Sequence, residues 1–433
     1  MPSSLLERKA LKVLVVGGGA REHTIAWKLG QSDRVGELLV APGNAGTARI
    51  ATNVPIDAED IDGVLEFARA QHVDFTVVGP EVPLAAGMVD AFQEAGLMAF
   101  GPTREAARIE SSKAFAKALM REHGVPTGAA RSFDDYEEAV RHVERSPAPV
   151  VIKADGLAAG KGVVVARTRQ AAIEALRRQM VDKEYGAAGD TVLIEEYLEG
   201  PEISVFAFVD GEGVSSMMAA CDYKAVGEGD TGPNTGGMGA YSPPPDELWN
   251  SEIERRVRGE IVEPVVKALR ESGSPYVGAL YAGLMMTAAG PKVIEFNCRL
   301  GDPEAQVVLP RLKTDLLEVM IRAAEGDVGA ARLEWDPRPC VGVVVASGGY
   351  PGKYSIGHRI LGLDKAPPDI EVFHASTRAP RADEGAFETS GGRVLTVSAQ
   401  GSDLEDARKR AYAGAASIGF KDSFYRRDIA LLA

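Results

Sequence analysis

The stretch Leu-Lys-Val-Leu-Val-Val-Gly-Gly-Gly-Ala-Arg-Glu-His at residues 11–23 decides the fold of the first part of the chain. Its unbroken apolar run to Val16 predicts a buried strand, and the residues from Arg21 to Leu29 predict a helix directly after a glycine turn. The same alternation continues to about residue 105, with strands predicted at 37–40, 75–78 and 98–100 and helices at 61–71 and 85–95. Because strands joined through helices run parallel, the pattern predicts a parallel sheet that binds ligands at the carboxyl ends of its strands. Further along, the sequence predicts a helical segment at 103–124, strands at 150–153 and 163–166, a polar glycine-rich loop at 227–240 and a long helix at 252–272.

The glycine turn itself is a candidate site for a phosphate group. Backbone N–H groups at the N-terminus of a helix bind phosphate, and glycines let the ligand approach closely. A dinucleotide cofactor is disfavoured because Glu22 stands where the third glycine of Gly-x-Gly-x-x-Gly should be. The second strand also ends in Ala-Pro-Gly-Asn at 41–44, where an acidic residue should meet the ribose. We therefore expect a small phosphorylated ligand, with a purely structural turn as the alternative.

The composition bounds the class of protein. A chain of 433 residues with 45% apolar and 25% charged residues is expected to form a soluble protein of two to four domains. A formal charge of −14 argues against a broad nucleic-acid surface, and no apolar run has membrane length. Three distant cysteines predict neither a zinc site nor a disulfide framework, which fits a reducing cytoplasm. Residues 1–10 lack a secretory core and are expected to be a disordered lead.

Residues 293–304, Val-Ile-Glu-Phe-Asn-Cys-Arg-Leu-Gly-Asp-Pro-Glu, predict a metal site. Side chains alternate along a strand, so Glu295 and Asn297 project from the same face. A carboxylate beside an amide oxygen suits Mg²⁺, which takes one or two protein oxygens and completes its shell with water and phosphate. Arg299 and Asp302 follow where the chain leaves the sheet. The alternative for the pair alone is a strand with polar edge residues.

Residues 153–162, Lys-Ala-Asp-Gly-Leu-Ala-Ala-Gly-Lys-Gly, form a second glycine-rich turn, between two short predicted strands. The turn is not a Walker P-loop, because only three residues separate Gly156 from Gly160 and Gly162 replaces Ser or Thr. A lysine on the incoming strand and a glycine turn instead predict a flap that could cover a triphosphate. The alternative is a hairpin turn with surface lysines.

Two further segments have the composition of ligand sites. Residues 195–202, Glu-Glu-Tyr-Leu-Glu-Gly-Pro-Glu, end a strand in a hinge that could offer backbone hydrogen bonds to adenine and a carboxylate to ribose, although acidic loops are usually only solvated. The loop Asp-Thr-Gly-Pro-Asn-Thr-Gly-Gly-Met-Gly-Ala-Tyr at 230–241 follows Asp-Tyr-Lys at 222–224. Its four glycines and proline predict a shaped backbone surface that holds a ligand.

Taken in order, these segments closely resemble the phosphoribosylamine–glycine ligase (glycinamide ribonucleotide synthetase) family of ATP-grasp enzymes. The resemblance runs from about Lys12 to the C-terminus. It includes, besides the segments above, Ala-Pro-Gly-Asn-Ala-Gly at 41–46, Val-Gly-Pro-Glu at 78–81 and Ser-Lys-Ala-Phe at 112–115. Three positions depart from the family pattern: Ala20 and Ser376 replace usual glycines, and Ala225 replaces a usual arginine after Asp-x-Lys.

The resemblance implies a multidomain fold of the α/β and α+β classes. Its parts are a Rossmann-like N-terminal parallel sheet, two ATP-grasp subdomains and a small mixed α/β C-terminal domain. The boundaries expected after the lead at 1–10 are an N-terminal domain with a helical linker at 11–125, a subdomain carrying the flap at 126–196, a central subdomain at 197–333 and the C-terminal domain at 334–433.

The resemblance also assigns roles to residues. For ATP they are Lys113, Lys153, Gly156, Gly160, Lys161, Gly162, Glu195, Glu196, Tyr197, Leu198 and Glu202. For the phosphoribosyl substrate and glycine they are Gly18, Gly19, Arg21, Glu22, Asn44, Glu81, Asn234, Thr235, Gly236 and Gly237. The catalytic candidates are Asp222, Lys224, Arg299 and Asp302, and the ligands for Mg²⁺ or Mn²⁺ are Glu295 and Asn297.

The implied reaction joins glycine to 5-phosphoribosylamine at the expense of ATP, through glycyl phosphate, in the second step of de novo purine biosynthesis. The products are glycinamide ribonucleotide, ADP and phosphate. Only small-molecule partners are expected, with neither nucleic acid nor membrane, in a cytoplasmic monomer or weak dimer. The alternatives are a carboxylating ATP-grasp ligase, a non-catalytic nucleotide-binding module and an NAD-dependent oxidoreductase.

Overall fold

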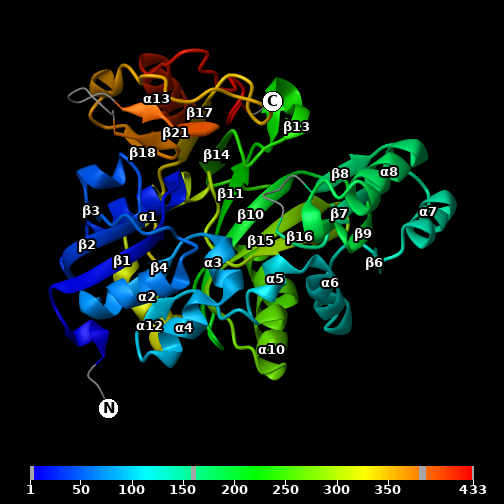
Figure 1. Cartoon of the computed structure of the whole chain (residues 1–433), viewed down its shortest axis with the longest axis horizontal. Coiled ribbons are helices and arrows are strands. Elements are labelled where there is room, and N and C mark those ends of the chain that lie inside the picture. The colour runs from blue at the N-terminus through cyan, green and yellow to red at the C-terminus, as the bar shows by residue number, and fades with distance from the viewer. Residues whose placement is uncertain (1–3, 158–161, 380–386, 432–433) are drawn as a thin grey trace.

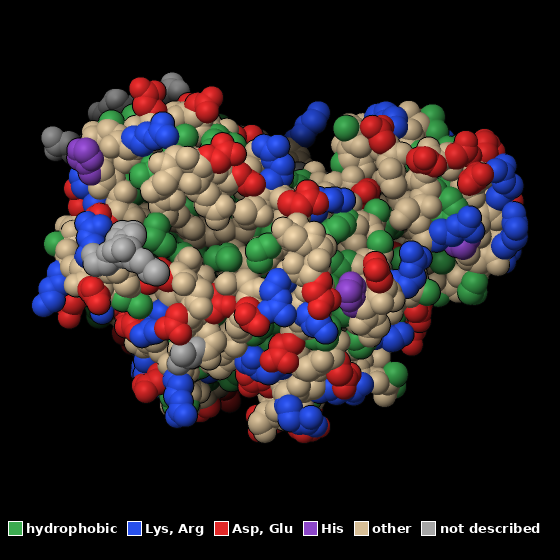
Figure 2. Space-filling view, turned by 90° about the horizontal axis from the view of Figure 1, so that it is seen from below, with side chains coloured by type: hydrophobic (Ala, Val, Ile, Leu, Met, Phe, Trp, Pro, Cys, Tyr) green, Lys and Arg blue, Asp and Glu red, His purple; other side chains and the backbone are tan. Residues whose placement is uncertain are grey.

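The computed structural model describes residues 4–157, 162–379 and 387–431 of the chain (Figure 1). In this part the strands form sheets of five, eight and four strands and two two-stranded ribbons. The arrangement confirms the predicted mixed α/β fold with a parallel sheet at the N-terminus. None of the described helices is long and apolar enough to cross a membrane. Figure 2 shows acidic and basic side chains interspersed over one face of the molecule.

The N-terminal sheet has the order β3-β2-β1-β4-β5, and its paired strands are parallel. The chain leaves β1 toward β2 on one side and later adds β4 on the other side, so the order reverses between β1 and β4. Ligands of such sheets bind beyond the carboxyl ends of the strands at this point. The strands are β1 (Leu11–Gly17), β2 (Val35–Pro42), β3 (Thr52–Asn53), β4 (Phe75–Val78) and β5 (Ala99–Phe100).

Helices α1 (Ala20–Leu29) and α2 (Ile61–Ala70) have nearly the predicted bounds. The helix predicted at 85–95 is divided, because Gly87 adopts a positive φ of 94° between α3 (Glu81–Ala86) and α4 (Met88–Glu94). The helical segment predicted at 103–124 is also two helices, α5 (Arg108–Ser111) and α6 (Lys113–Glu122). Their break comes at Ser112, whose side chain caps α6 by accepting from Phe115 N.

The eight-stranded sheet has the order β16-β15-β10-β11-β14-β17-β21-β18 and is antiparallel throughout its paired strands. Its last three strands come from the predicted C-terminal domain, so that domain continues the central sheet (Figure 1). The strands are β10 (Glu202–Asp210), β11 (Met218–Asp222), β14 (Gly239–Ser242), β15 (Val277–Thr287), β16 (Gly290–Asn297), β17 (Cys340–Ala346), β18 (Glu371–His374) and β21 (Arg393–Gln400).

Helices pack on this sheet from the central and C-terminal parts of the chain. The long helix predicted at 252–272 is α9 (Ser251–Val257) and α10 (Glu263–Glu271), joined by a π-helical segment at Arg258–Val262. α12 (Leu316–Glu325) packs against β10 and β15, and α13 (Leu404–Ser417) packs against β17 and β21. A short helix, α11 (Ala305–Val308), follows the segment at 298–304.

The four-stranded sheet carries the predicted flap and has the order β6-β9-β7-β8. It forms a separate body at the right of Figure 1, with its own apolar cluster under α7 (Tyr136–Arg145) and α8 (Arg169–Leu176). A π-helical segment, Arg177–Val181, continues α8. The strands are β6 (Ala130–Phe133), β7 (Val150–Ala154), β8 (Val163–Ala166) and β9 (Val192–Glu196).

Two segments differ from their sequence expectations. The loop expected at 227–240 contains β13 (Thr231–Asn234), which pairs with β12 (Ala225–Gly227), and the start of β14. Residues 4–10, expected to be disordered, include a 3-10 turn at Leu5–Glu7 whose Leu5 is buried. Ser4 Oγ and Leu5 N both donate to the Glu325 carboxylate at the end of α12. The remaining ribbon pairs β19 (Thr377–Arg378) with β20 (Glu388–Thr389).

Candidate functional site

Glu295 and Asn297 lie at the end of β16, the outer strand of the eight-stranded sheet. Burial raises the pKa of Glu295, but Lys224, Lys153 and Lys113 outweigh it and hold the pKa below its usual value. Asn297 Nδ2 is buried without a hydrogen-bond partner among the described residues. The charged carboxylate can bind a divalent cation together with the amide oxygen of Asn297, whereas Nδ2 is a donor and is left to donate to an oxygen of a bound ligand. No group of three or more His, Cys, Asp or Glu in the described ranges could hold a metal, so this pair would need phosphate and water as further ligands.

A buried cluster of two lysines and one carboxylate lies beside this pair. Lys153 Nζ from β7 is 3.0 Å from Glu195 Oε2 on β9 and donates to Ile294 O on β16 at 3.0 Å. Lys117 Nζ from α6 is also 3.0 Å from Glu195 Oε2. The structure therefore places the Glu195 carboxylate between two ammonium groups, with only its buried Oε1 unpaired among the described residues. Lys117 was not predicted as a site residue, although its i+4 spacing from Lys113 places both lysines on one face of α6.

The base of the flap is fastened to the start of α6. Lys113 Nζ donates to Gly156 O at 3.1 Å, and Asp155 Oδ1 accepts from Ala114 N at 3.1 Å. Ser112 Oγ donates to Asp155 Oδ2 at 3.2 Å. These contacts hold the two predicted phosphate-binding lysines, Lys113 and Lys153, on the two sides of one turn. Of the other flap residues, Gly162 accepts from Ala154 N at 2.9 Å, whereas Gly160 and Lys161 lie outside the described residues.

The predicted adenine hinge continues from β9. Glu196 N donates to Ala129 O at 2.8 Å, and the Glu196 carboxylate accepts from Ala129 N at 3.0 Å. Tyr197 and Leu198 are half-buried at the edge of the flap sheet. Glu202, predicted for the ATP ribose, forms an ion pair with Lys224, predicted for the other substrates. The nucleotide side and the acceptor side of the site thus meet in one ion pair.

Asp222 lies next to that pair, at the end of β11. Burial raises the pKa of Asp222 to about 8. Lys224 opposes this shift, and the Glu304 and Glu202 carboxylates add to it. Glu304 is buried and accepts from Ser204 Oγ at 3.0 Å, and the same hydroxyl is 3.5 Å from Asp222 Oδ1. Glu304 is the last residue of the segment at 293–304, and no role was predicted for it from sequence.

The glycine turn after β1 is shaped by Glu22. A Cβ on Gly17, which has φ +126°, would lie 2.4 Å from Glu22 Cγ, so this position requires glycine. Glu22 Oε2 accepts from Gly19 N at 2.8 Å, and Glu22 Oε1 accepts from Arg21 Nε at 2.6 Å. Arg21 is buried and also lies 3.6 Å from Glu81 Oε2. The Arg21 guanidinium is thus already engaged by two carboxylates.

Asn44 supports the turn rather than facing a ligand. Its Nδ2 donates to Gly18 O at 3.0 Å and to His374 O at 2.8 Å. Its Oδ1 accepts from Gly46 N at 2.8 Å and from Thr47 N at 3.0 Å. The side chain has little hydrogen-bonding capacity left, and it joins the glycine turn to the C-terminal part of the chain.

Arg299 and Asp302 both face the N-terminal part of the chain. Arg299 Nε donates to Glu81 Oε2 at 3.1 Å, and Arg299 Nη2 donates to Glu110 Oε1 at 3.0 Å. Asp302 Oδ2 accepts from Arg21 N at 3.4 Å, at the first turn of α1. Arg299 is therefore held between two carboxylates, and Asp302 reaches the N-terminal end of α1, where phosphate binding is predicted. Glu110 was not predicted as a partner of Arg299.

The loop from Asn234 to Gly237 folds back on the Asp-x-Lys motif. Thr235 N and Thr235 Oγ1 both donate to Lys224 O, at 2.7 and 2.8 Å. A Cβ on Gly237, which has φ +110°, would lie 2.3 Å from Pro303 Cδ, so the loop packs closely on the 293–304 segment. Gly236 is exposed, as is Asn234, which ends β13.

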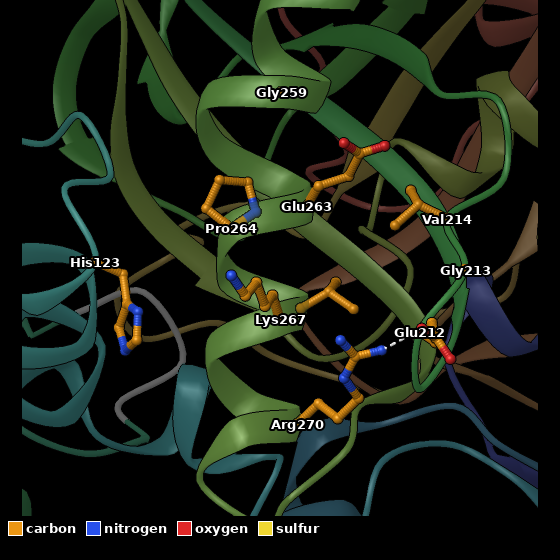
Figure 3. A pocket seen from close by; sticks show the side chains of 10 residues that line it. His123, Glu212, Gly213, Val214, Gly259, Glu263, Pro264, Lys267 and Arg270 are labelled. Carbon is orange, nitrogen blue, oxygen red and sulfur yellow. Dashed lines mark ion pairs between the residues drawn. The ribbon is translucent and has the colours of Figure 1, made fainter.

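An open cavity of about 490 Å³ lies apart from these residues (Figure 3). It is beyond Asp210, at the far end of β10 from Glu202. Figure 3 shows the Arg270–Glu212 ion pair and Lys267 around it, with His123 on the opposite wall. The cavity includes none of the predicted site residues. Its lining residues are His123, Glu212, Gly213, Val214, Gly259, Glu263, Pro264, Val266, Lys267 and Arg270.

Three family models match the chain in sequence. They are described as the N domain, the ATP-grasp (A) domain and the C domain of phosphoribosylglycinamide synthetase, and they match residues 11–110, 111–305 and 340–432. Among curated relatives, the phosphoribosylamine–glycine ligase of Xanthomonas axonopodis pv. citri is 49% identical over 422 residues, which cover 97% of each chain. The ligase of the same name from Halalkalibacterium halodurans is 50% identical over 419 residues, covering 97% of this chain and 96% of the relative.

Solved structures agree with the sequence relatives. The crystal structure of phosphoribosylamine–glycine ligase from Thermotoga maritima has a TM-score of 0.84 and 31% identity, and the match covers 97% of this chain and 100% of that one. A biotin carboxylase from Campylobacter jejuni has a TM-score of 0.71 at 16% identity, covering 97% of this chain and 94% of that one. The second likeness shows that the fold extends to other ATP-dependent enzymes.

Proposed function

The chain belongs to the phosphoribosylglycinamide synthetase family, whose ATP-grasp ligases join glycine to 5-phosphoribosylamine, and we propose how its residues divide the work of that reaction. The chain is a ligase that forms glycinamide ribonucleotide, ADP and phosphate from glycine, 5-phosphoribosylamine and ATP. The reaction proceeds through glycyl phosphate and is the second step of de novo purine biosynthesis.

The observation that carries the proposal is the contact between the flap and β16. Lys153 Nζ lies 3.0 Å from Ile294 O, the carbonyl next to Glu295. A phosphate chain between the two sheets would therefore meet Lys153 and Lys113 on one side and the predicted metal ligands, Glu295 and Asn297, on the other. The lysines bind phosphate oxygens, the flap excludes water from a hydrolysable intermediate, and residues 196–198 and Glu202 hold adenine and ribose.

Glu295 and Asn297 would hold Mg²⁺ or Mn²⁺. The charged state of Glu295 and the position of Asn297 two residues further along the same strand support this assignment. When bound, the ion would neutralise charge on the ATP phosphates. Lys113 and Lys153 supply positive charge to the same phosphates from the chain itself.

The acceptor side lies between Asp222 and the loop from Asn234 to Gly237. A glycine carboxylate oxygen attacks the γ-phosphorus of ATP to give glycyl phosphate and ADP. The amine of phosphoribosylamine then attacks the acyl carbon, and phosphate leaves with the oxygen that glycine supplied. The attacking amine must lose a proton, and Asp222, with a pKa of about 8, suits this role because an effective base has a pKa near the working pH. Lys224 balances the charge on the reacting carboxylate.

The amine substrate lies at the carboxyl ends of β1 and β4. Its phosphate binds beside Gly18 and Gly19 at the start of α1, where it would replace Glu22 Oε2 as the acceptor for Gly19 N, and Glu81 faces its ribose. Arg299 positions Glu81 through their 3.1 Å hydrogen bond. Glu22 and Asn44 shape the glycine turn from behind.

The proposal extends to the organisation and setting of the protein. We place the domain boundaries at 11–125, 126–196, 197–333 and 334–433, with the last two sharing one sheet. The working form is a cytoplasmic monomer. Light scattering of the purified chain measures its mass directly against the 45.8 kDa of one chain.

The activity is tested by a coupled assay in which phosphoribosylamine is made in situ from ribose 5-phosphate and ammonia. ADP release is expected to require glycine and the amine together. Turnover that needs bicarbonate and not glycine would instead identify a carboxylating ligase. ADP release that is independent of glycine would contradict the function.

A further inference from the structure

Arg393 reaches the site from the C-terminal part of the chain, and the proposed function gives it no role. It opens β21, and its Nη1 donates to Asp302 O at 2.9 Å and to Gly237 O at 3.3 Å. The same nitrogen lies 3.3 Å from Asp302 Oδ1 and donates to Gly236 O. All of these contacts use Nη1. Within the described ranges, the hydrogen bonds of Arg393 leave Nε and Nη2 without an acceptor.

The glycine-rich loop is built around this guanidinium. A Cβ on Gly236 would lie 2.9 Å from Arg393 Cζ and 3.1 Å from Nη2, so the planar group lies flat against the loop backbone. A side chain at position 236 would displace the guanidinium from this place. Arg393 is nevertheless partly open, with 22% of its side chain exposed. The arginine is therefore held in one orientation while part of it faces solvent.

The phosphate-binding end of α1 needs a cation that its own residues do not supply. A phosphate monoester carries close to two negative charges at neutral pH. Arg21, the arginine of the glycine turn, is buried and lies 2.6 Å from Glu22 and 3.6 Å from Glu81. Using it would break its buried ion pair with Glu22 and its contact with the partly exposed Glu81. Its charge is already balanced within the fold.

Asp302 places Arg393 beside that helix end. One oxygen of Asp302 accepts from Arg21 N in the first turn of α1, at 3.4 Å, and the other lies 3.3 Å from Arg393 Nη1. The helix N-terminus and the guanidinium are thus separated by one carboxylate group. Gln306 Nε2 donates to Asp302 Oδ1, the oxygen that also lies beside Arg393, at 2.9 Å. A phosphate group at the glycine turn lies within reach of Arg393.

We propose that Arg393 is a substrate-binding residue whose unused N–H groups bind the phosphate of the phosphorylated amine, together with the N-terminus of α1. The inference rests on the proposed placement of that phosphate at Gly18 and Gly19. The planar fork of arginine matches two phosphate oxygens, and Asp302 and the loop carbonyls orient it. The C-terminal part of the chain then completes the substrate site, because β21 supplies its cation.

Ribose 5-phosphate serves as the stable probe, since it has the phosphate and lacks the reactive amine. Its affinity is measured by calorimetry for the full chain and for Arg393→Met, and the KM for glycine is measured in the coupled assay. A charged hydrogen bond of ordinary strength predicts at least about tenfold weaker binding of ribose 5-phosphate by the variant. The KM for glycine is expected to change less than about twofold. Arg393→Lys keeps the charge without the fork and is expected to bind with intermediate affinity.

The matched control is Arg378→Met, which removes a C-terminal arginine that pairs only with Glu388, at 3.1 Å, among the described residues. It is expected to bind ribose 5-phosphate as the unmodified chain does. Equal affinity of Arg393→Met and the unmodified chain would overturn the inference, as would a larger effect on glycine than on ribose 5-phosphate. If Arg393→Met does not fold, unchanged binding by Arg393→Lys overturns it. Failure of the unmodified chain to release ADP with glycine would sink the proposed function, while the binding comparison would still test Arg393.

Discussion

Replacing Glu195 with glutamine tests the buried cluster that joins the flap to the rest of the site. The Glu195 carboxylate is 3.0 Å from both Lys117 Nζ and Lys153 Nζ, and all three side chains are buried. Glutamine keeps the shape of the side chain and removes its negative charge, so the ammonium groups of Lys117 and Lys153 lose the carboxylate that they share. Breaking a buried ion pair from one side costs about 3–5 kcal/mol. For a folding unit of roughly 150–250 residues, this loss of stability corresponds to a fall in Tm on the order of 10 °C.

The pH dependence of this effect has a definite sign. Burial lowers the pKa of Lys117 below 10.5, and Glu195 is the main group that opposes the shift. In the variant the pKa falls further, so between that pKa and about 10.5 the folded chain binds fewer protons than the unfolded chain. The free energy of unfolding then rises with pH in this window. The difference in Tm between the variant and the unmodified chain is therefore expected to narrow between pH 7 and pH 9.5.

The matched control is Glu196→Gln, one residue further along the chain. Glu196 is exposed, and its ion pair with Lys292 at 3.6 Å is worth about 1 kcal/mol or less. Differential scanning fluorimetry at several pH values compares the two variants. Equal stability of Glu195→Gln and Glu196→Gln, or a difference that does not depend on pH, would refute the role given to the lysine cluster.

Three further predictions concern the acceptor side of the site and the predicted metal ligands. Glu295→Gln is expected to lower turnover at limiting Mg²⁺ at least about tenfold, while its Tm stays within about 2 °C of that of the unmodified chain. Unchanged activity at limiting Mg²⁺ would refute the metal assignment. If Asp222 is the base, kcat rises with pH through about 8, and this limb disappears in Asp222→Asn; a limb that survives rules Asp222 out. Arg426 is buried, donates to Ala225 O at 2.9 Å and lies 4.9 Å from the centre of the Tyr223 ring. Arg426→Met is therefore expected to speed hydrogen exchange at 225–235 and to raise the KM for glycine. Unchanged exchange would show that other contacts hold this hairpin.

The parts of the fold that depend on local pattern were predictable from sequence. β4 and β8 have the predicted bounds, because each is a short apolar run that ends at a glycine, a proline or a charged helix start. The division of the helix at 85–95 was not predicted, since the positive φ of Gly87 depends on how both halves pack. The β12–β13 ribbon was also missed, because its polar, glycine-rich sequence does not show the alternation of a buried strand.

The contacts of the candidate site were likewise predictable from sequence only in part. Glu295 and Asn297 could be paired from their spacing alone, because alternation along a strand fixes their common face. Arg393 could not be connected with Asp302, which is 91 positions earlier, since they meet only because α11, directly after Asp302, packs against β21. The resemblance assigned Glu195 to ATP, but it did not predict that the carboxylate lies between Lys117 and Lys153. Such pairings arise from tertiary packing that neither spacing nor motif specifies.

The fate of the carboxylate oxygens of glycine tests the acyl phosphate route most directly. Glycine labelled with ¹⁸O in its carboxylate is turned over with ATP and phosphoribosylamine, and the released phosphate is analysed by mass spectrometry. Attack of the carboxylate on ATP, followed by attack of the amine on the acyl carbon, predicts one labelled oxygen in the phosphate for every amide bond formed. Phosphate released without label, while glycinamide ribonucleotide accumulates, would contradict the route through glycyl phosphate.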